Sequence, residues 1–242
     1  MASFDAIATT LAEHGLRWFP ILDYCPAWAS SDGTKFGAPT DRPAFAAYAA
    51  AFAARYGVGG SFWASHPQVP ALPVAEYEIW NEENIPLFWH QQATGPEHYA
   101  SLVLAARRSI KAVVPRAHVV LGGVLDAGAD GLAFLAAMEH AHPGVLRTMD
   151  AIGYQPYQGN LQVILKRIAA LRRLLRRAGA SAVPIDISET AANHHLTSVA
   201  SWTHAMARLG TTLAASPGCE VSRVLAYMAG PPIGNTNADS SG

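Results

Sequence analysis

The sequence predicts an α/β fold built on a parallel sheet. Six short runs rich in Val, Ile, Leu and Tyr alternate with longer stretches that have the periodicity of amphipathic helices, which is typical of βαβ units. Most of these runs are apolar nearly throughout, as parallel strands covered on both faces are. The predicted strands are residues 16–24, 75–80, 118–124, 149–155, 183–188 and 221–229.

The composition indicates one compact domain with a large core. Of the 242 residues, 50% are hydrophobic and 14% are charged, well below the roughly 25% charged fraction of an average domain. The net charge of -1 leaves no dominant basic face, which argues against a nucleic-acid partner. The longest nearly all-apolar run, residues 44–54, is too short to cross a bilayer. The first 15 residues show no signal-peptide pattern, and the compartment stays open.

The helices between the strands have recognisable ends. One is predicted over residues 43–56, starting at a proline, and another begins at a capping box opened by Thr94 and ends near Val114. Further helices are predicted over residues 4–14, 160–178 and 196–215, the first two ended by Gly15 and Gly179. The basic residues of helix 160–178 are predicted to form a solvated face. They are Lys166, Arg167, Arg172, Arg173, Arg176 and Arg177.

The two cysteines, Cys25 and Cys219, belong to no CxxC motif and to no Cys/His metal pattern. We therefore expect two unpaired, partly buried thiols and no metal site.

Polar residues follow the ends of the predicted strands, where parallel α/β folds bind their ligands. Glu82 and Glu189 each come directly after a strongly apolar strand. Glycoside hydrolysis uses two facing carboxyl groups, one protonated to release the leaving oxygen and one ionised to attack or to activate water. The other residues at these ends include Asp23, Tyr24, Trp28, Asn81, Glu83, Asn84, Gln155, Tyr157, Asn193, His194, His195, Tyr227 and Met228.

Two of these segments resemble signatures of the clan A glycoside hydrolases. "IWNEEN" (79–84) is similar to their Asn-Glu motif, and "DISET" (186–190) is similar to their nucleophile segment. Together with "LDYCPAWAS" and "HVVLGGV", they most resemble family 39 and related bacterial retaining β-glycosidases. The resemblance implies a (β/α)8 TIM barrel, truncated here, with strands three to eight present and the first two strands and the final helix missing. Residues 1–229 would form this incomplete barrel domain, and residues 230–242 a flexible tail.

The resemblance also implies roles for individual residues. Glu82 corresponds to the general acid/base and Glu189 to the nucleophile. Asn81 would hydrogen-bond the sugar 2-hydroxyl, and Tyr157 would steady the nucleophile. Gln155 stands where the family often has histidine, so it can hydrogen-bond but cannot titrate.

The remaining rim residues carry weaker expectations. Trp28 and Trp89 are candidates for stacking on a sugar ring or, equally, for packing at the rim. Tyr227 is a further substrate-binding candidate. His194 and His195 fit either a subsite or an ordinary loop.

Glu83 stands where the family often has proline, and we expect a solvated neighbour that raises the pKa of Glu82.

The predicted function is a retaining O-glycosyl hydrolase that cleaves β-glycosidic bonds of an oligo- or polysaccharide without a cofactor. The alternative is a noncatalytic, degenerate barrel fragment that binds carbohydrate or a partner chain. An α/β-hydrolase is not supported, because no Gly-x-Ser-x-Gly elbow is present. Missing strands would leave two open sheet edges, so self-association through them is expected.

Overall fold

The computed structural model describes residues 2–90, 95–126, 130–157, 161–190, 199–216 and 218–227. Within them a single six-stranded sheet has the order β1-β2-β3-β4-β5-β6, and every neighbouring pair is parallel. The predicted parallel α/β fold is thus confirmed. The strands are β1 (Ile21–Leu22), β2 (Glu76–Asn81), β3 (His118–Leu125), β4 (Ala151–Gln155), β5 (Ile185–Thr190) and β6 (Val221–Ala226).

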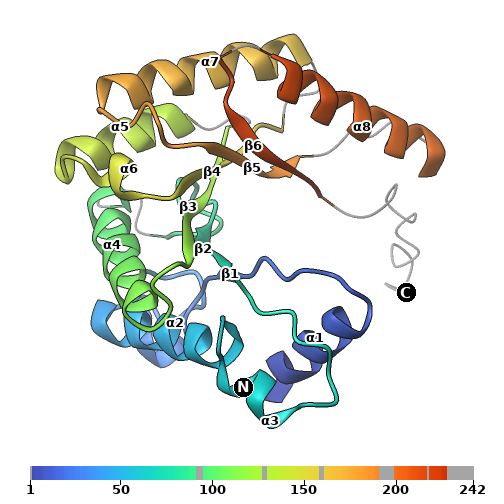
Figure 1. Cartoon of the computed structure of the whole chain (residues 1–242). Helices are drawn as coiled ribbons and strands as arrows, with labels where there is room; N and C mark the ends of the chain where they lie inside the picture. Colours follow the sequence, from blue (N-terminus) through green and yellow to red (C-terminus); the bar gives the residue numbers. More distant parts are fainter. Residues whose placement is uncertain are drawn as a thin grey trace, which may run out of the picture.

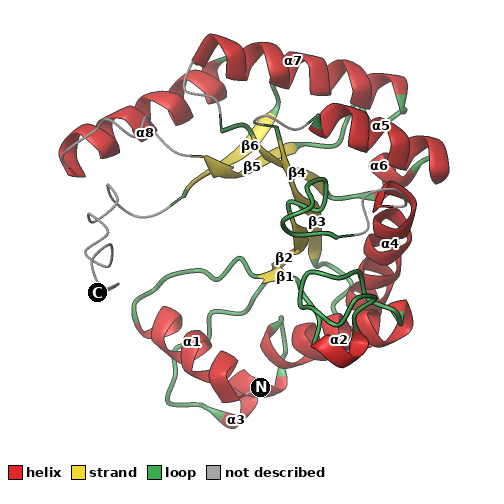
Figure 2. Ribbon diagram, turned by 180° about the vertical axis from the view of Figure 1, so that it is seen from behind, coloured by secondary structure: helices red, strands yellow, loops and turns green. Residues whose placement is uncertain are grey.

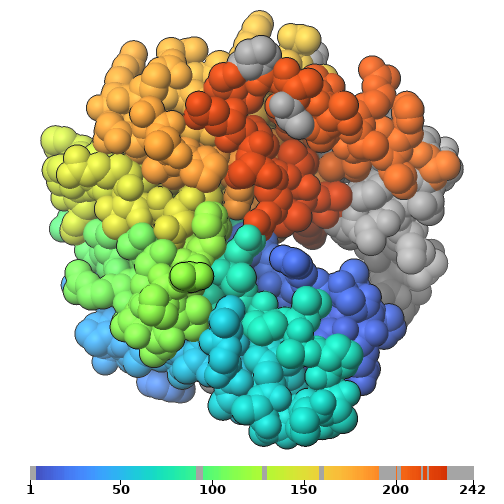
Figure 3. All heavy atoms as spheres, viewed as in Figure 1, coloured from blue at the N-terminus to red at the C-terminus, as the bar shows by residue number. Residues whose placement is uncertain are grey.

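The helices form an outer layer around the curved sheet (Figures 1 and 2). In this sheet β1 and β6 are the two edge strands, and each pairs with one neighbour. Figure 3 shows an opening in one face of the molecule between the blue N-terminal residues and the red residues of β6. The helices are α1 (Ala2–Glu13), α2 (Arg42–Tyr56), α3 (Ser61–Ser65), α4 (Gly95–Val113), α5 (Gly131–Ala141), α6 (Val145–Thr148), α7 (Leu161–Arg177) and α8 (Val199–Ala215), with a short 3-10 helix, η1 (Ala27–Ala29).

Strand β2 illustrates how the sheet separates an apolar outer layer from a polar interior. Tyr77 and Ile79 are fully buried in the hydrophobic core, and the Tyr77 ring meets the ring of Phe52 on α2 at 6.4 Å. Glu78, between them in the sequence, points to the opposite face because successive strand residues alternate. Burial and the neighbouring carboxyl group of Glu83 raise the pKa of Glu78 well above its usual value. The inside of the barrel is therefore polar and acidic.

The first predicted strand, residues 16–24, is much shorter than expected. Only Ile21 and Leu22 pair with β2, opposite Glu78 and Ile79. The backbone N–H of Glu78 also donates to the carbonyl of Pro20 at 3.0 Å, but proline itself has no N–H to donate to a ladder. Within the described residues β1 pairs with β2 alone, and this ladder ends after Leu22.

The five predicted helices are found to within a few residues, whereas α3, α5 and α6 were not predicted. Gly15 and Gly179 adopt left-handed φ values of 66° and 67° at the helix ends they were predicted to form. Helix α5 was not predicted, although the Asp130 side chain caps it by accepting from the N–H of Ala133 at 3.0 Å. Thr94, residues 196–198 and the tail 230–242 lie outside the described residues, and the single domain over residues 1–229 stays a prediction.

The basic face of α7 corrects the expectation of a solvated surface at two positions. Arg172 is only 2% exposed, and its guanidinium donates to the carbonyls of Cys219 at 2.7 Å and Val183 at 2.6 Å. Arg167 pairs with the buried carboxylate of Asp126. Both arginines tie α7 to its neighbours, and the buried Arg172 needs such partners because a buried cation is costly without them. Cys25 and Cys219 are free and buried, close to the prediction of unpaired, partly buried thiols.

At the amino ends of the strands, Arg223 of β6 reaches the other edge of the sheet. Its guanidinium lies 4.8 Å from the centre of the Phe19 ring and forms an ion pair with Glu76 at the start of β2. It also lies 3.9 Å from the buried carboxylate of Asp186 on β5. Because β1 and β6 are not paired with each other, these contacts link the two edge regions of the sheet.

Among the described residues, no helix is long and apolar enough to cross a membrane.

Candidate active site

The carboxyl end of β2 leaves regular strand geometry at the predicted acid. Trp80 and Glu82 have φ values of 70° and 48°, in the left-handed region that non-glycine residues seldom occupy and that is enriched at functional sites. The backbone N–H of Glu82 donates to the carbonyl of Gly123 on β3 at 3.2 Å. The chain therefore turns at this point while it remains attached to the sheet.

Two side chains hold this turn in place. The buried hydroxyl of Tyr99 on α4 donates to the carbonyl of Ile79 at 2.7 Å and accepts from the N–H of Gly122 at 2.6 Å. Asn84 forms a pair of hydrogen bonds with the backbone of Leu125, at 2.8 and 2.9 Å. The register between β3 and β4 shifts nearby, between Leu121 and Val124. Irregularities of this kind re-aim side chains beside active sites.

Glu189 lies at a second irregularity, where the register between β5 and β6 shifts between Ile187 and Thr190. The Tyr157 hydroxyl donates to Oε2 of Glu189 at 2.7 Å. The ring of Tyr227 meets the Tyr157 ring edge-on, with 6.1 Å between centroids. Tyr157 and Tyr227 thus line the rim beside Glu189, as their positions after strands predicted.

The two glutamates are close enough to influence each other, and their environments differ. Burial and the negative charge of Glu189 raise the pKa of Glu82 to about 7. Burial also raises the pKa of Glu189, but the hydrogen bond from Tyr157 lowers it. A carboxyl group that accepts a hydrogen bond favours its ionised form. The hydrogen bond from Tyr157 therefore partly offsets the effect of burial on the pKa of Glu189, whereas burial and a neighbouring charge act together to raise the pKa of Glu82.

Asn81, the last residue of β2, is oriented by Gln155. The side-chain nitrogen of Gln155 donates to Oδ1 of Asn81 at 2.9 Å. With its oxygen engaged, the Asn81 amide keeps its two N–H donors for another acceptor. Gln155 is fully buried and can fix this orientation at any pH because an amide does not titrate.

Glu83 is not the solvated neighbour that we expected from the sequence. It is fully buried, and burial together with the charge of Glu82 raises its pKa to about 8. Room for it comes from Gly122, where a Cβ atom would lie 2.5 Å from Oε2 of Glu83. The expectation that Glu83 raises the pKa of Glu82 is also wrong, because the causes of that increase are burial and the charge of Glu189.

The two candidate tryptophans have different surroundings. Trp28, on η1, is 86% exposed. Trp89 is 1% exposed, and its ring packs edge-on against Trp80 at 5.0 Å and Tyr99 at 5.9 Å. Of the two roles considered for Trp89, packing is the one that this burial favours. His194 and His195 lie outside the described residues. In the part of the chain that the structure describes, no cluster of metal ligands is found.

Two residues after β1 belong to the site although the sequence assigned them no role. Burial raises the pKa of Asp23 to about 6. Tyr24 has a left-handed φ of 61°, and burial and the charges of Asp23 and Glu82 raise its pKa to about 12. Their position after a strand was the available signal, but no motif distinguished them. Asp23 is therefore a further acid with a raised pKa at the carboxyl end of β1.

A parallel α/β barrel with paired glutamates on its carboxyl-end rim is the class of structure on which many glycosidases are built. No protein-family model and no curated protein matches the sequence. Among solved structures, the chain is similar to a glucosidase from Croceicoccus marinus, with 14% identity and a TM-score of 0.69 over 95% of this chain and 46% of that one. It is also similar to a monomeric beta-xylosidase from Caulobacter crescentus CB15, with 16% identity and a TM-score of 0.66 over 96% and 50%.

A third similar structure is the catalytic domain of a GH26 endo-beta-1,4-mannanase from Bacillus sp. JAMB-750, with 15% identity and a TM-score of 0.58 over 96% of this chain and 63% of that one. At these identities the likeness shows the fold. The chain has the barrel fold of these glycoside hydrolases and spans about half the length of the first two. The predicted truncated TIM barrel and its likeness to the clan A glycosidases are confirmed at this level.

Proposed function

We propose that the protein is a glycoside hydrolase that cleaves β-glycosidic bonds of an oligo- or polysaccharide with retention of configuration. The observation that carries this proposal is the contrast between two interacting glutamates. The pKa of Glu82 is raised to about 7 by burial and by Glu189, whereas Glu189 accepts a hydrogen bond from Tyr157. One carboxyl group is thus suited to give a proton and the other to attack.

The reaction has two steps. In the first, Glu82 donates its proton to the glycosidic oxygen while a Glu189 oxygen bonds to the anomeric carbon, and the bond to the leaving group breaks. In the second, the Glu82 carboxylate takes a proton from water, the water oxygen bonds to the anomeric carbon, and Glu189 leaves. The side-chain N–H groups of Asn81 suit a hydroxyl of the sugar next to the anomeric carbon, because Gln155 already engages the side-chain oxygen.

The substrate class is supported by the structures that share the fold. They include a beta-xylosidase and an endo-beta-1,4-mannanase, and both names describe action on β-linked sugars. Tyr157 and Tyr227 supply aromatic surface beside Glu189, and Tyr227 is 50% exposed. Aromatic rings of this kind pack against the apolar face of a pyranose.

The roles of the glutamates are tested by two variants. Glu189→Ala should abolish turnover of aryl β-glycosides, and added azide should restore part of it by attacking in place of the carboxylate. Glu82→Ala should slow substrates with poor leaving groups far more than activated aryl glycosides, because only the former need the proton. The anomeric configuration of the first-formed product, followed by NMR, tests retention. An inverted product would reject the two-step mechanism.

A noncatalytic carbohydrate-binding barrel is the second candidate. It is favoured by the short β1 and by the two edge strands, each with a single neighbour within the described part of the chain. Turnover of a panel of aryl β-glycosides by the purified protein separates the two. Saturable sugar binding without turnover would support this candidate and reject the hydrolase.

A further inference from the structure

A groove of about 430 Å³ lies between α5 and α7, which are neighbours in the outer layer of helices (Figures 1 and 2). None of its lining residues belongs to a strand or to the glutamate rim. Side chains four residues apart on a helix share one face, and such rows form the ridges on which another helix packs. The apolar floor consists of one such row from each helix, Leu132 and Ala136 from α5, and Ala170, Leu174 and Ala178 from α7.

Two arginines form a second row beside this floor. Arg173 and Arg177 both line the groove and lie one turn apart on α7. Both are exposed, and among the described residues neither forms a salt bridge. Helix α7 contains no acidic residue of its own. The α7 side of the groove therefore carries two positive charges, side by side, that are available to a partner.

The acidic residue in the lining, Glu139 of α5, is engaged elsewhere. Its carboxylate accepts from the backbone N–H of Gly144 at 2.5 Å and from that of Leu146 at 3.1 Å. The groove is thus positive along α7 and negative on its α5 side. A uniformly anionic surface, such as nucleic acid or an acidic membrane, would be repelled by Glu139. The arrangement suits a partner with an apolar face and carboxylates along one side of that face.

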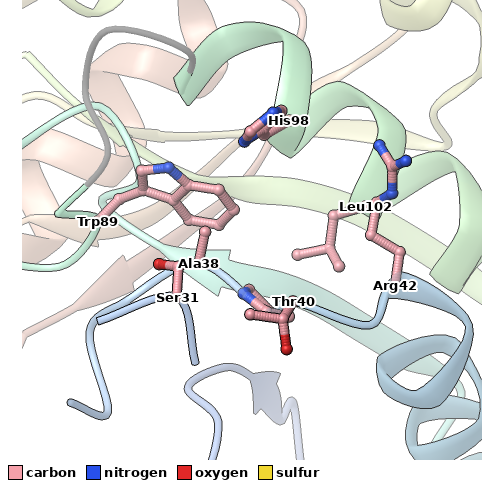
Figure 4. Close-up of a pocket in the computed structure, with 8 residues that line it drawn as sticks. Ser31, Ala38, Thr40, Arg42, Trp89, His98 and Leu102 are labelled. Atoms are coloured by element: carbon pink, nitrogen blue, oxygen red, sulfur yellow. The ribbon is translucent and has the colours of Figure 1, made fainter. Parts of the chain in front are cut away.

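A smaller pocket, of about 290 Å³, lies between the segment after β1 and helix α4 (Figure 4). Arg42 is the single arginine among the residues that line it. This pocket therefore has no row of charges that the carboxylates of a helix could match, and the groove between α5 and α7 is the stronger candidate for an interaction surface.

We propose that the groove between α5 and α7 docks an acidic amphipathic helix of a partner protein. Apolar side chains of that helix pack on Leu132 and Leu174, and two carboxylates spaced by three or four residues pair with Arg173 and Arg177. A guanidinium binds a carboxylate through two parallel hydrogen bonds, so each pair also fixes the position of the helix. A partner bound here leaves the glutamate rim free, and this role goes beyond the proposed hydrolysis.

The test is fluorescence anisotropy of a labelled, alanine-based peptide of about 16 residues, long enough to be helical, titrated with the whole chain. The acidic peptide carries a leucine stripe with glutamates at four-residue spacing along one side of it. Its neutral match carries glutamine in place of each glutamate. We expect the acidic peptide to bind about tenfold more tightly, since two exposed ion pairs together are worth roughly that factor.

Variants of the protein locate the site. Arg173→Gln and Arg177→Gln should each weaken binding of the acidic peptide by about two- to fivefold. Ala136→Trp, which fills the groove, should abolish binding of both peptides. Arg176→Gln is the matched control and should bind as the unmodified protein does, because Arg176 is an exposed arginine of the same helix that does not line the groove.

Three results would overturn the proposal: equal binding of the two peptides, unchanged binding by a folded double variant of Arg173→Gln and Arg177→Gln, or an equal loss in Arg176→Gln. Binding to vesicles of phosphatidylserine and phosphatidylcholine without binding to the peptide would also overturn it, in favour of a membrane. Thermal melts confirm that each variant is folded. The double variant should hydrolyse aryl β-glycosides as the unmodified protein does. A protein without turnover would reject the proposed function and leave the peptide result standing.

Discussion

The hydroxyl of Tyr157 donates a 2.7 Å hydrogen bond to Oε2 of Glu189. Tyr157 follows β4 and Glu189 belongs to β5, so the bond crosses between neighbouring strand ends. It opposes the effect of burial on the Glu189 carboxyl group, whose pKa is raised by burial and lowered by this bond. Tyr157 thereby orients the Glu189 carboxyl group and favours its ionised form, as the proposed role of Glu189 requires.

Replacing Tyr157 with phenylalanine should lower kcat/KM by about 10- to 100-fold, because a hydrogen bond to a charged group is worth about 1.5–3 kcal/mol. Without the donor the pKa of Glu189 rises, so the acidic limb of the pH profile should move to higher pH. Tyr227→Phe is the control, since that ring is next to Tyr157. An unchanged acidic limb in Tyr157→Phe would show that the bond does not tune Glu189.

The basic limb of the kcat/KM profile should fall above about pH 7, since Glu82 must be protonated to act as the acid and its pKa is raised to about 7. Part of that increase comes from the charge of Glu189. Glu189→Gln removes this charge, so NMR titration of the Glu82 carboxyl carbon should then give a lower pKa. The same pKa in both proteins would mean that the two glutamates do not interact.

The stability of the protein should fall as pH rises from about 4.5 to 8. In this window the folded protein keeps a proton on Glu83, because burial raises the pKa of that carboxyl group from its ordinary 4.5 to about 8. The unfolded chain releases that proton, so the free energy of unfolding decreases with pH. Each tenfold difference in acidity between the folded and unfolded states corresponds to about 1.4 kcal/mol. Glu82 and Asp23, with pKa values of about 7 and 6, act in the same direction.

Glu83→Gln removes the buried charge and should flatten this dependence, measured as urea unfolding at several pH values. The expected gain near pH 8 is on the order of a few kcal/mol. Glu97→Gln, at an exposed position of α4, is the matched control. If the two variants lose stability with pH equally, burial of Glu83 is not the cause.

Tyr99→Phe should destabilise the protein and reduce activity together. The change leaves the buried carbonyl of Ile79 and the buried N–H of Gly122 without the hydroxyl that joins them. Each buried group left unsatisfied costs about 1–3 kcal/mol. Thermal melting and kcat/KM are the measurements, and Tyr48→Phe, half-buried on α2, is the control. Equal effects of the two variants would contradict a special role for Tyr99.

Arg223→Met should open the amino ends of the barrel. Methionine can keep contact with Phe19, but it loses the ion pair with Glu76 and leaves Asp186 without its nearby cation. We expect a lower melting temperature and, through the exposed strand edges, more self-association. Light scattering after size-exclusion chromatography measures this, with exposed Arg116→Met as the control. A variant as monomeric and as stable as the control would show that the edges need no such link.

The sequence predicted the features that depend on periodicity and missed those that depend on local backbone exceptions. Glu82 and Glu189 could be assigned to one rim because the carboxyl ends of parallel strands meet there. The burial of Glu83 could not be predicted, because the left-handed φ values of Trp80 and Glu82 break the two-residue alternation of the strand. The sequence could not distinguish Trp28 from Trp89. The burial of Trp89 depends on the rings of Trp80 and of Tyr99 on α4, which pack against it only in the folded structure.

The contact between Phe19 and Arg223 also bears on how the chain folds. It joins a residue near the start of the chain to one in the last strand, and contacts between distant residues form slowly because a large loop must close first. During synthesis, the first strand and its helices leave the ribosome long before β6 exists. Until β6 arrives, Phe19 and Glu76 lack their guanidinium partner and Asp186 lacks its cation. We therefore expect the native barrel to form only after translation of the C-terminal strand, so nascent chains that end before it would depend on chaperones.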